Sequence, residues 1–242
     1  MTDLKQTAAL ALTCLDLTNL DDDCDAKAIE DLCARAVTRH GPVAAVCIWP
    51  KFVGQAKSLL HGTPVKVATV VNFPSGQESI AEVRSMTAQA ITDGTDEIDM
   101  VIPWDDVLEG HIGVVSPTVR SVRAAAGGAT LKAILETGML DTTEMITAAA
   151  LEAINGGADF LKTSTGKASV NVTPKAAKTV LEVIRDSGKA VGFKPSGGVR
   201  TTGAAAEYIE LANEVMGDGW VTPETFRIGS ARLLDDLLAV LD

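Results

Sequence analysis

Eight short runs of aliphatic and β-branched residues recur along the chain, and this recurrence restricts its fold more than any other feature. The centres of the runs lie roughly 23 to 36 residues apart, about the length of one βα unit. Eight strands alternating with helices predict a parallel sheet of the α/β class, and eight strands close a (β/α)8 TIM barrel. The runs are Leu15–Thr18, Ala44–Trp49, Val67–Phe73, Glu97–Ile102, Thr130–Glu136, Phe160–Thr163, Ala190–Lys194 and Arg227–Gly229.

Helix start signals fall in the intervals between these runs. A short polar residue followed three positions later by Glu, or directly by Pro, marks a helix N-terminus. The segment Asp3–Leu12 precedes the first run and predicts an additional N-terminal helix. The start signals are Ser75 with Glu78, Asp141 with Glu144, and Thr173 with Pro174.

The length of the chain fits one barrel. Its 242 residues are close to the roughly 250 of a typical (β/α)8 barrel, although two small domains would also fit this length. No linker rich in Pro, Gly or Ser separates two halves, so we expect a single domain over residues 1–242. Aromatic residues make up only 4% of the chain, and the core must therefore be built from Ala, Val, Ile and Leu.

The overall charge argues against several classes of partner. The net charge is −11, from 21 basic and 32 acidic residues. Such a chain lacks the basic footprint of a nucleic-acid binder and the basic clusters that attract anionic membranes. No apolar stretch reaches the roughly 18 residues that a membrane span needs. We expect neither nucleic acid nor membrane as a partner.

The cysteines and histidines favour a metal-free cytoplasmic protein. The cysteines form no CxxC pair, and we expect no signal peptide before them, which indicates reduced thiols. The thiol of Cys47, near the end of the second run, is expected to be buried. The histidines are scattered without metal-ligand spacing, so no metal or other cofactor is predicted. These residues are Cys14, Cys24, Cys33, Cys47, His40, His61 and His111.

Charged residues interrupt runs that should be apolar throughout. Parallel strands that are covered on both faces read as continuous apolar segments. A single buried charge is usually a satisfied ion pair, and we keep this interpretation for Lys132, which lies deeper in its strand. Charges on five separate strands, however, would converge near one end of the barrel, where barrel enzymes build their active sites. The charges are Asp16, Asp99, Lys132, Glu136, Lys162 and Lys194.

Two of these residues suggest amine chemistry. Lys162 and Lys194 lie on the sixth and seventh runs, which are neighbours in a barrel. Burial and a second nearby cation both disfavour an ammonium group, and only a neutral amine attacks a carbonyl carbon. Asp99, two strands before Lys162, is placed to transfer protons through a water molecule. The pattern predicts that Lys162 forms a Schiff base with a small aldehyde.

Two glycine-containing loops suggest a phosphate site at the same end. Gly197 and Gly198 follow the seventh run, Gly229 and Ser230 follow the eighth, and each loop precedes a helix. Backbone N–H groups in such loops, together with the helix dipole, attract anions, and barrels often bind phosphate there. One glycine pair alone would be an ordinary tight turn. The basic residues beside the loops, Arg200, Arg232 and Lys167, make phosphate binding the better interpretation.

The chain resembles the deoxyribose-phosphate aldolases, a family of class I aldolases. The resemblance rests on Ile98–Pro103 (IDMVIP), Ala158–Lys167 (ADFLKTSTGK) and Val191–Arg200 (VGFKPSGGVR), in the family's order. It implies a barrel that cleaves 2-deoxy-D-ribose 5-phosphate reversibly to glyceraldehyde 3-phosphate and acetaldehyde, in deoxyribonucleotide catabolism, without metal or organic cofactor. Family members are commonly homodimers.

The resemblance also implies roles for individual residues. Lys162 takes the Schiff-base position, Lys194 that of the second lysine which tunes it, and Asp99 that of the acid/base. Asp16 and Thr18 take positions at the substrate hydroxyls, and Lys167, Gly197, Gly198 and Gly229 take positions where the family holds the phosphate. Thr165, Arg200 and Ser230 are further expected substrate-binding residues.

The sequence after the eighth run departs from the family pattern, and two alternative functions remain open. After the eighth run, many members carry Ser-Ser or Thr-Ser, where this chain has Ala231-Arg232. A hydroxyl is lost and a guanidinium gained, which changes phosphate affinity in either direction. The alternatives are another Schiff-base barrel aldolase, such as a transaldolase-like enzyme, and a barrel that binds sugar phosphates without catalysis. The joint presence of Asp99, Lys162 and Lys194 favours catalysis.

Overall fold

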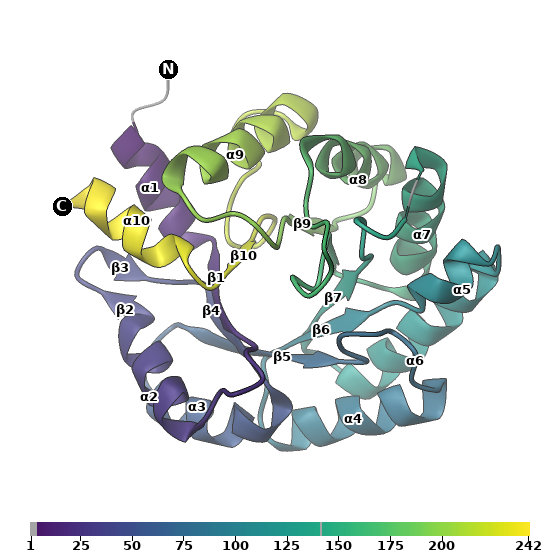
Figure 1. The fold of residues 1–242 in the computed structure, drawn as a ribbon, viewed down its shortest axis with the longest axis horizontal. Coiled ribbons are helices and arrows are strands. Elements are labelled where there is room, and N and C mark those ends of the chain that lie inside the picture. Colours follow the sequence, from purple (N-terminus) through teal and green to yellow (C-terminus); the bar gives the residue numbers. More distant parts are fainter. Residues whose placement is uncertain (1–3, 141) are drawn as a thin grey trace.

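The computed structural model describes residues 4–140 and 142–242, in which eight parallel strands form a central barrel surrounded by helices (Figure 1). Hydrogen-bonded neighbours follow the order β10-β1-β4-β5-β6-β7-β8-β9. The barrel therefore confirms the predicted fold class. The strands are β1 (Leu15–Asn19), β4 (Ala45–Ile48), β5 (Lys66–Val71), β6 (Glu97–Val101), β7 (Thr130–Ile134), β8 (Phe160–Lys162), β9 (Gly192–Lys194) and β10 (Ile228–Ser230).

Parallel backbone bridges between the ends of this order close the barrel. The N–H of Phe193 donates to the carbonyl of Thr225 at 2.8 Å, and the N–H of Arg227 donates to the carbonyl of Phe193 at 3.0 Å. Above them, the N–H of Gly229 donates to the carbonyl of Pro195 at 3.0 Å. These bridges join the β9 end of the order to β10, which also pairs with β1, so the circle of strands is complete.

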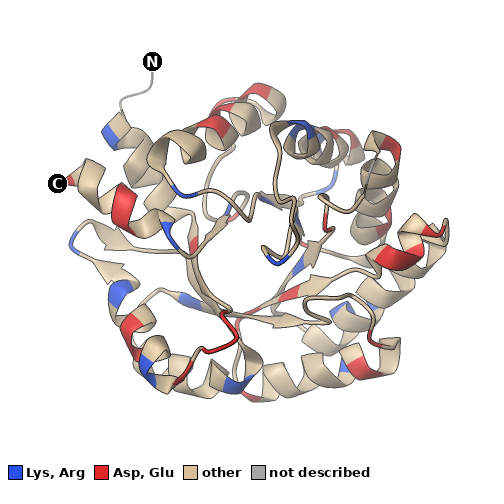
Figure 2. Ribbon diagram, in the orientation of Figure 1, with Lys and Arg blue, Asp and Glu red and all other residues tan. Residues whose placement is uncertain are grey.

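The helices form the outer layer. Lys, Arg, Asp and Glu are spread over them, and both charge types also occur on the central strands (Figure 2). None of the described helices is long and apolar enough to cross a lipid bilayer. The helices are α1 (Leu4–Thr13), α2 (Ala26–Arg35), α3 (Val53–Leu59), α4 (Ile80–Thr92), α5 (Trp104–Leu108), α6 (Val115–Ala126), α7 (Thr143–Gly156), α8 (Pro174–Ser187), α9 (Thr202–Met216) and α10 (Leu233–Leu241), with 3-10 turns η1 (Pro50–Phe52) and η2 (Ile112–Val114) and a short antiparallel pair, β2 (Val37–Thr38) with β3 (Gly41–Pro42).

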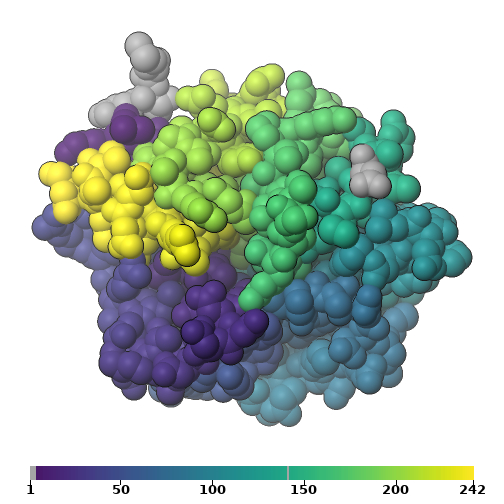
Figure 3. All heavy atoms as spheres, viewed as in Figure 1, coloured from purple at the N-terminus to yellow at the C-terminus, as the bar shows by residue number. Residues whose placement is uncertain are grey.

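The predicted N-terminal helix is present as α1, which packs against α9 and α10. The purple N-terminal segment and the yellow C-terminal segment accordingly lie side by side on the surface (Figure 3). Every predicted strand is also present, but most end earlier than expected. Asn72 and Glu136, which were expected to be within strands, have φ values of 56° and 52°. This left-handed backbone cannot continue a strand.

One of the predicted helix starts is wrong. The capping box before α4 is formed by Ser79 and Glu82, four residues after the predicted pair. Gly76 in the intervening loop has φ 76°, and a Cβ there would lie 2.3 Å from the carbonyl oxygen of Ile102. The loop is thus held against β6, and the helix begins only after it.

Of the other two predicted helix starts, one is confirmed and the other includes a residue that is not described. Thr173 caps α8 with Pro174 at the first helical position, as predicted. Thr142 caps α7 by accepting a hydrogen bond from the N–H of Met145, and the predicted Asp141 lies outside the described residues.

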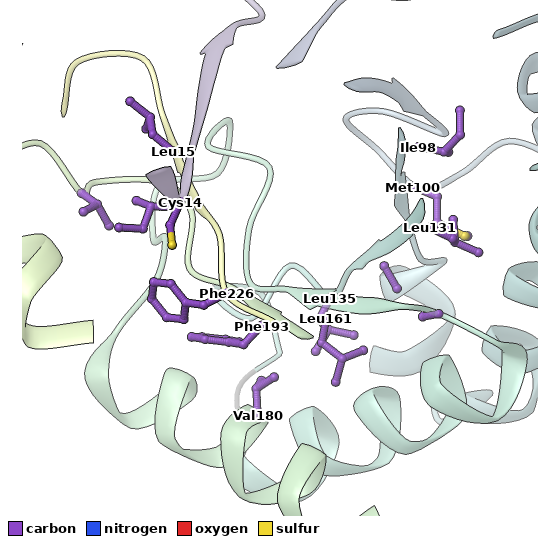
Figure 4. Packing of buried hydrophobic residues seen from close by; sticks show 14 of the residues in the cluster. Cys14, Leu15, Ile98, Met100, Leu131, Leu135, Leu161, Val180, Phe193 and Phe226 are labelled. Atoms are coloured by element: carbon purple, nitrogen blue, oxygen red, sulfur yellow. The ribbon is translucent and has the colours of Figure 1, made fainter. Parts of the chain in front are cut away.

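The apolar core lies mainly between the strands and the helices. Leu161 of β8 and Phe193 of β9 point toward α8, which contributes Val180 (Figure 4). Successive side chains of a strand point to opposite faces, so the alternate residues point into the barrel. One part of the interior is lined by small apolar residues, namely Ala45, Cys47, Ala68 and Val70, which form a separate cluster with Leu20.

Close packing of α7 on α6 gives a test of this outer layer. A Cβ added at Gly156 would lie 2.5 Å from the Cβ of Val119 and 2.9 Å from the carbonyl oxygen of Ser116. We expect Gly156→Ala to lower the free energy of unfolding by about 1–3 kcal/mol, because the helices must move apart. Gly54→Ala is the matched control, since nothing lies within 4 Å of the added methyl group. Urea unfolding measures both; equal midpoints for the two variants would contradict the packing.

Candidate active site

Six charged side chains form a closed ring inside the barrel, in which acids and bases alternate. We call this set the charge ring. All six are buried, the most exposed being Arg227 at 7%. They come from four strands, β1, β6, β7 and β9, and from the residue before β10. In order around the ring they are Asp16, Lys194, Asp99, Lys132, Glu97 and Arg227.

Each neighbouring pair in the charge ring is an ion pair. The Lys194 amine donates to Asp16 and, at 2.7 Å, to Oδ2 of Asp99. The Lys132 amine donates to Oδ1 of Asp99 at 2.8 Å and to Oε2 of Glu97 at 2.5 Å.

Arg227 completes the charge ring. Its guanidinium donates to Oε1 of Glu97 at 2.9 Å and to Oδ1 of Asp16 at 2.7 Å. The ring thus contains three carboxylates and three cations, and it is neutral when all six groups are ionised. Buried charges persist only when they are paired in this way.

Lys162 is a seventh charge attached to this neutral ring. Its amine donates to Oδ2 of Asp99 at 2.8 Å, the oxygen that also accepts from Lys194. Among the described residues, Asp99 supplies the only carboxylate within ion-pair distance of Lys162. The sequence predicted that the two lysines would be neighbours, and the structure joins them through this shared carboxylate. Asp99 contacts both amines directly.

The neighbouring charges in the cluster determine the protonation states of Asp99 and Lys194. Burial alone would raise the pKa of Asp99, but Lys132, Lys162 and Lys194 outweigh it and hold the pKa well below its usual range. Burial alone would lower the pKa of Lys194, but Asp16 and Asp99 hold it above its usual range. Lys194 therefore stays an ammonium group and Asp99 a carboxylate near neutral pH.

A pocket of about 230 Å³ opens at the C-terminal ends of the strands. Lys162, 3% exposed, lines it, whereas no cation of the charge ring does among the described residues. The predicted Asp16 also lies beneath the pocket, bound to Lys194 and Arg227. The other predicted substrate-binding residues all line the pocket: Thr18 of β1, Thr165 and Lys167 after β8, Gly197, Gly198 and Arg200 after β9, and Gly229 and Ser230 of β10.

The loop after β9 is built for a close anion. Gly197 and Gly198 have φ values of 81° and 90°, and a Cβ at Gly197 would lie 2.3 Å from Oδ1 of Asn171. Within the described chain, the N–H groups of these two glycines donate to no protein acceptor. Two such donors beside a pocket are suited to phosphate oxygens.

Three cations surround these glycines. Arg200, Arg232 and Lys167 line the pocket. The amine of Lys167 donates to Asp22 at 3.0 Å, which links the loop after β8 to the loop after β1 across the face seen in Figure 3. The Ser230 hydroxyl donates to the carbonyl of Val199 at 2.6 Å and so ties the loop after β9 to β10.

Glu136 has a different position from the other predicted charges. Its carboxylate accepts from the hydroxyl of Thr165 at 2.5 Å and from its N–H at 3.3 Å. The Thr165 hydroxyl in turn accepts from the N–H of Lys167 at 3.0 Å. Glu136 thus fixes the loop after β8, and burial raises its pKa.

Sequence reasoning missed two members of the charge ring, Glu97 and Arg227. Each is the first residue of its predicted run, and a charged residue is common at the end of a strand. The available signal was the spacing of Glu97 and Asp99, since residues two apart share one face of a strand. Arg227 had no comparable signal, because its partners lie on β1 and β6.

Two further groups lie outside the pocket. The Cys47 thiol is buried, as expected, 3.9 Å from Oδ2 of Asp99, and burial raises its pKa. Asp106 of α5 and Glu109 and His111 after it gather on the surface, and none of them lines the pocket.

Acid titration tests the charge ring. Burial alone would raise the pKa of Asp16, but Lys194, Lys132 and Arg227 lower it below the value of about 3.9 in an unfolded chain. The ionised carboxylate therefore stabilises the fold above about pH 4, and this contribution is lost as the pH falls further. We expect Asp16→Asn to be about 3–5 kcal/mol less stable at pH 7 and to lose stability less steeply below about pH 4. Urea unfolding between about pH 7 and 2 measures this; parallel curves would contradict it.

Comparisons with known proteins agree with the geometry. Residues 10–227 match the family model described as DeoC/LacD family aldolase. A deoxyribose-phosphate aldolase of Agrobacterium fabrum (strain C58) is 48% identical over 239 residues, 98% of this chain and 92% of that protein. A crystal structure of a candidate deoxyribose-phosphate aldolase from Toxoplasma gondii ME49 has a TM-score of 0.91 at 24% identity, covering 98% of this chain and 94% of that chain. The tetrameric deoxyribose phosphate aldolase of Aeropyrum pernix has a TM-score of 0.80 at 21% identity, covering 98% and 96%.

The two similar structures support the fold only. Membership of the family rests on the family model and on the Agrobacterium relative. The resemblance found in the sequence motifs is confirmed: the chain belongs to the DeoC/LacD family of aldolases.

Proposed function

We propose that this protein cleaves 2-deoxy-D-ribose 5-phosphate reversibly to D-glyceraldehyde 3-phosphate and acetaldehyde, with Lys162 as the Schiff-base residue. One observation carries the assignment: of the four cations in and on the charge ring, Lys162 is the one that lines the pocket in the described chain. It is also the cation for which the ring provides no carboxylate of its own. The buried cluster is neutral when Lys162 is a neutral amine, which is the form that attacks a carbonyl carbon.

The first step is imine formation. The neutral Lys162 amine attacks C1 of the open-chain sugar, and the resulting carbinolamine loses water to give an iminium ion. Asp99 accepts a hydrogen bond from this amine at 2.8 Å, so its carboxylate is within reach of the proton that the nitrogen loses. Lys194, an ammonium group bound to the same oxygen, is the matching proton donor.

The second step breaks the bond between C2 and C3. The C3 hydroxyl loses its proton and becomes the carbonyl of glyceraldehyde 3-phosphate. The C2–C3 electron pair forms a C1–C2 double bond while the C=N π pair moves onto nitrogen, which leaves an enamine on Lys162. Protonation at C2 and addition of water to the iminium ion then release acetaldehyde. The ion pair of Asp99 and Lys194 supports these proton transfers, because it holds one base and one acid together beside the reacting nitrogen.

The phosphate would bind where the glycine loop and the cations meet. The free N–H groups of Gly197 and Gly198 and the side chains of Lys167, Arg200 and Arg232 support this position. Thr18 and Thr165 line the same pocket as Lys162 and are proposed to bind substrate hydroxyls. Asp16 is proposed to act from beneath the pocket, through its ion pair with Lys194.

Borohydride trapping tests the Schiff base. With acetaldehyde and borohydride, we expect the wild-type protein to gain one reduced two-carbon adduct, mapped to Lys162 by peptide mass spectrometry. The Lys162→Ala variant should gain none and lose at least about 10³-fold in turnover, because the only other lysine that lines the pocket among the described residues, Lys167, is bound to Asp22. An adduct on Lys194 would refute the assignment of roles.

Product analysis separates the alternatives. Cleavage of 2-deoxyribose 5-phosphate to acetaldehyde supports this function; an adduct formed only with a ketone donor would indicate a transaldolase-like enzyme. Sugar-phosphate binding without turnover would indicate a non-catalytic barrel.

Substitution of Arg232 tests the departure from the family pattern. We expect Arg232→Ser to raise KM for 2-deoxyribose 5-phosphate by about 3- to 10-fold, since a solvent-screened charge on the phosphate is lost. Turnover of unphosphorylated 2-deoxyribose should not change. Arg84→Ser, an exposed arginine of α4 outside the pocket, is the matched control. An unchanged or lowered KM would show that Arg232 does not bind the phosphate.

We also propose the cellular setting and the assembly. A single barrel domain with four free, buried thiols fits the reducing cytoplasm. A homodimer is supported by an apolar groove of about 590 Å³ beside α4, lined by Trp49, Phe73 and Met86 among others.

A further inference from the structure

We propose that Lys132 is a positioning residue that keeps Lys162 as the surplus cation of the buried cluster, and thereby keeps its amine available for imine formation. The proposal rests on the function proposed above. Lys132 itself is fully buried and, in the described chain, is not part of the pocket lining. It therefore acts through the charge ring and touches no substrate.

The contacts of Lys132 suit this role. Its amine lies within ion-pair distance of three carboxylates: Glu97 at 2.5 Å, Asp99 at 2.8 Å and Asp16 at 3.4 Å. It binds Oδ1 of Asp99, which leaves Oδ2 to the amines of Lys162 and Lys194. Lys132 thus takes half of the hydrogen-bonding capacity of the carboxylate that Lys162 depends on.

Counting charges shows what its removal would do. With Lys132, the ring has three carboxylates and three cations, so a proton on Lys162 gives the cluster a net charge of +1. Without Lys132, the ring has a net charge of −1, and a protonated Lys162 makes the cluster neutral. Because unbalanced charge in a dry interior is costly, loss of Lys132 turns Lys162 from a surplus cation into a needed counter-ion.

The other groups that face Lys162 do not take over this function. Asp99 on β6 and Lys194 on β9 are ionised near neutral pH for the reasons given above. Glu136, after β7, and Cys47, on β4, both have pKa values raised by burial. Glu136 points its carboxylate at the loop after β8 and lies in no ion pair of the described chain. Variants of Lys132 and Glu97 therefore differ in the net charge of the ring.

The test compares the pH dependence of adduct formation on Lys162, measured with acetaldehyde and cyanoborohydride. Lys132→Met keeps the length of the side chain and removes the charge. We expect its midpoint to move up by about 1–3 pH units, so that the trapping rate at pH 7 falls about 10-fold or more and recovers at higher pH.

The double variant Lys132→Met/Glu97→Gln provides the rescue. It leaves two carboxylates, Asp16 and Asp99, opposite two cations, Lys194 and Arg227, so the ring is neutral again. We expect its midpoint to return to within about 0.5 pH unit of wild type. Glu97→Gln alone makes the ring more positive and should not move the midpoint upward. A purely structural role for Lys132 would not produce this pattern.

Several outcomes would overturn the proposal. It fails if Lys132→Met keeps the wild-type midpoint, or if the double variant shifts as far as the single one. If Lys132→Met does not fold by circular dichroism, the double variant decides: a midpoint raised by more than one pH unit overturns the inference. A wild-type protein that forms no adduct on Lys162 would instead refute the proposed function, whereas an adduct with an unshifted Lys132→Met refutes only this inference.

Discussion

The interaction on which the rest of this structure depends is the balance of charge inside the barrel. Seven ionisable groups are buried together, and six of them satisfy one another as a neutral ring. An unpaired charge at this depth would cost several kcal/mol, so the balance is needed for the barrel to fold at all. The same balance leaves Lys162 as the one cation without a carboxylate of its own. Stability and reactivity therefore have one origin here.

The architecture makes this arrangement possible. The outward faces of the strands pack against helices and hold the apolar core, so the inward faces are free to carry charge (Figures 2 and 4). Part of the interior is filled by the small residues Ala45, Cys47, Ala68 and Val70, and the longer charged side chains extend across the remaining space. The ring lies beneath the pocket with all six side chains buried, and Lys162 lies at the boundary between ring and pocket.

The sequence predicted the strands well because both faces of each strand are buried, which leaves a clear apolar run. It also predicted four of the six ring charges and Lys162, since those charges interrupt such runs, but it missed Glu97 and Arg227 at the beginnings of their runs. It did not predict how they pair. Asp16 and Arg227 are 211 positions apart and meet only because β10 closes onto β1. The capping box before α4 failed for a local reason: two Ser-x-x-Glu signals follow each other, and contact of Gly76 with β6 selects the second.

The separation of the two kinds of positive charge explains how an acidic chain can attract a phosphorylated substrate. The cations of the charge ring are fully paired below the pocket, and their fields are largely cancelled by their partners. Under the proposed function, attraction of an anion comes from Lys167, Arg200 and Arg232, which line the pocket in a chain whose net charge is −11. Because Lys167 is already paired with the exposed Asp22, the two arginines are the cations least compensated by their surroundings. The replacement of a family hydroxyl by Arg232 thus adds charge at the place where the ring cannot supply it.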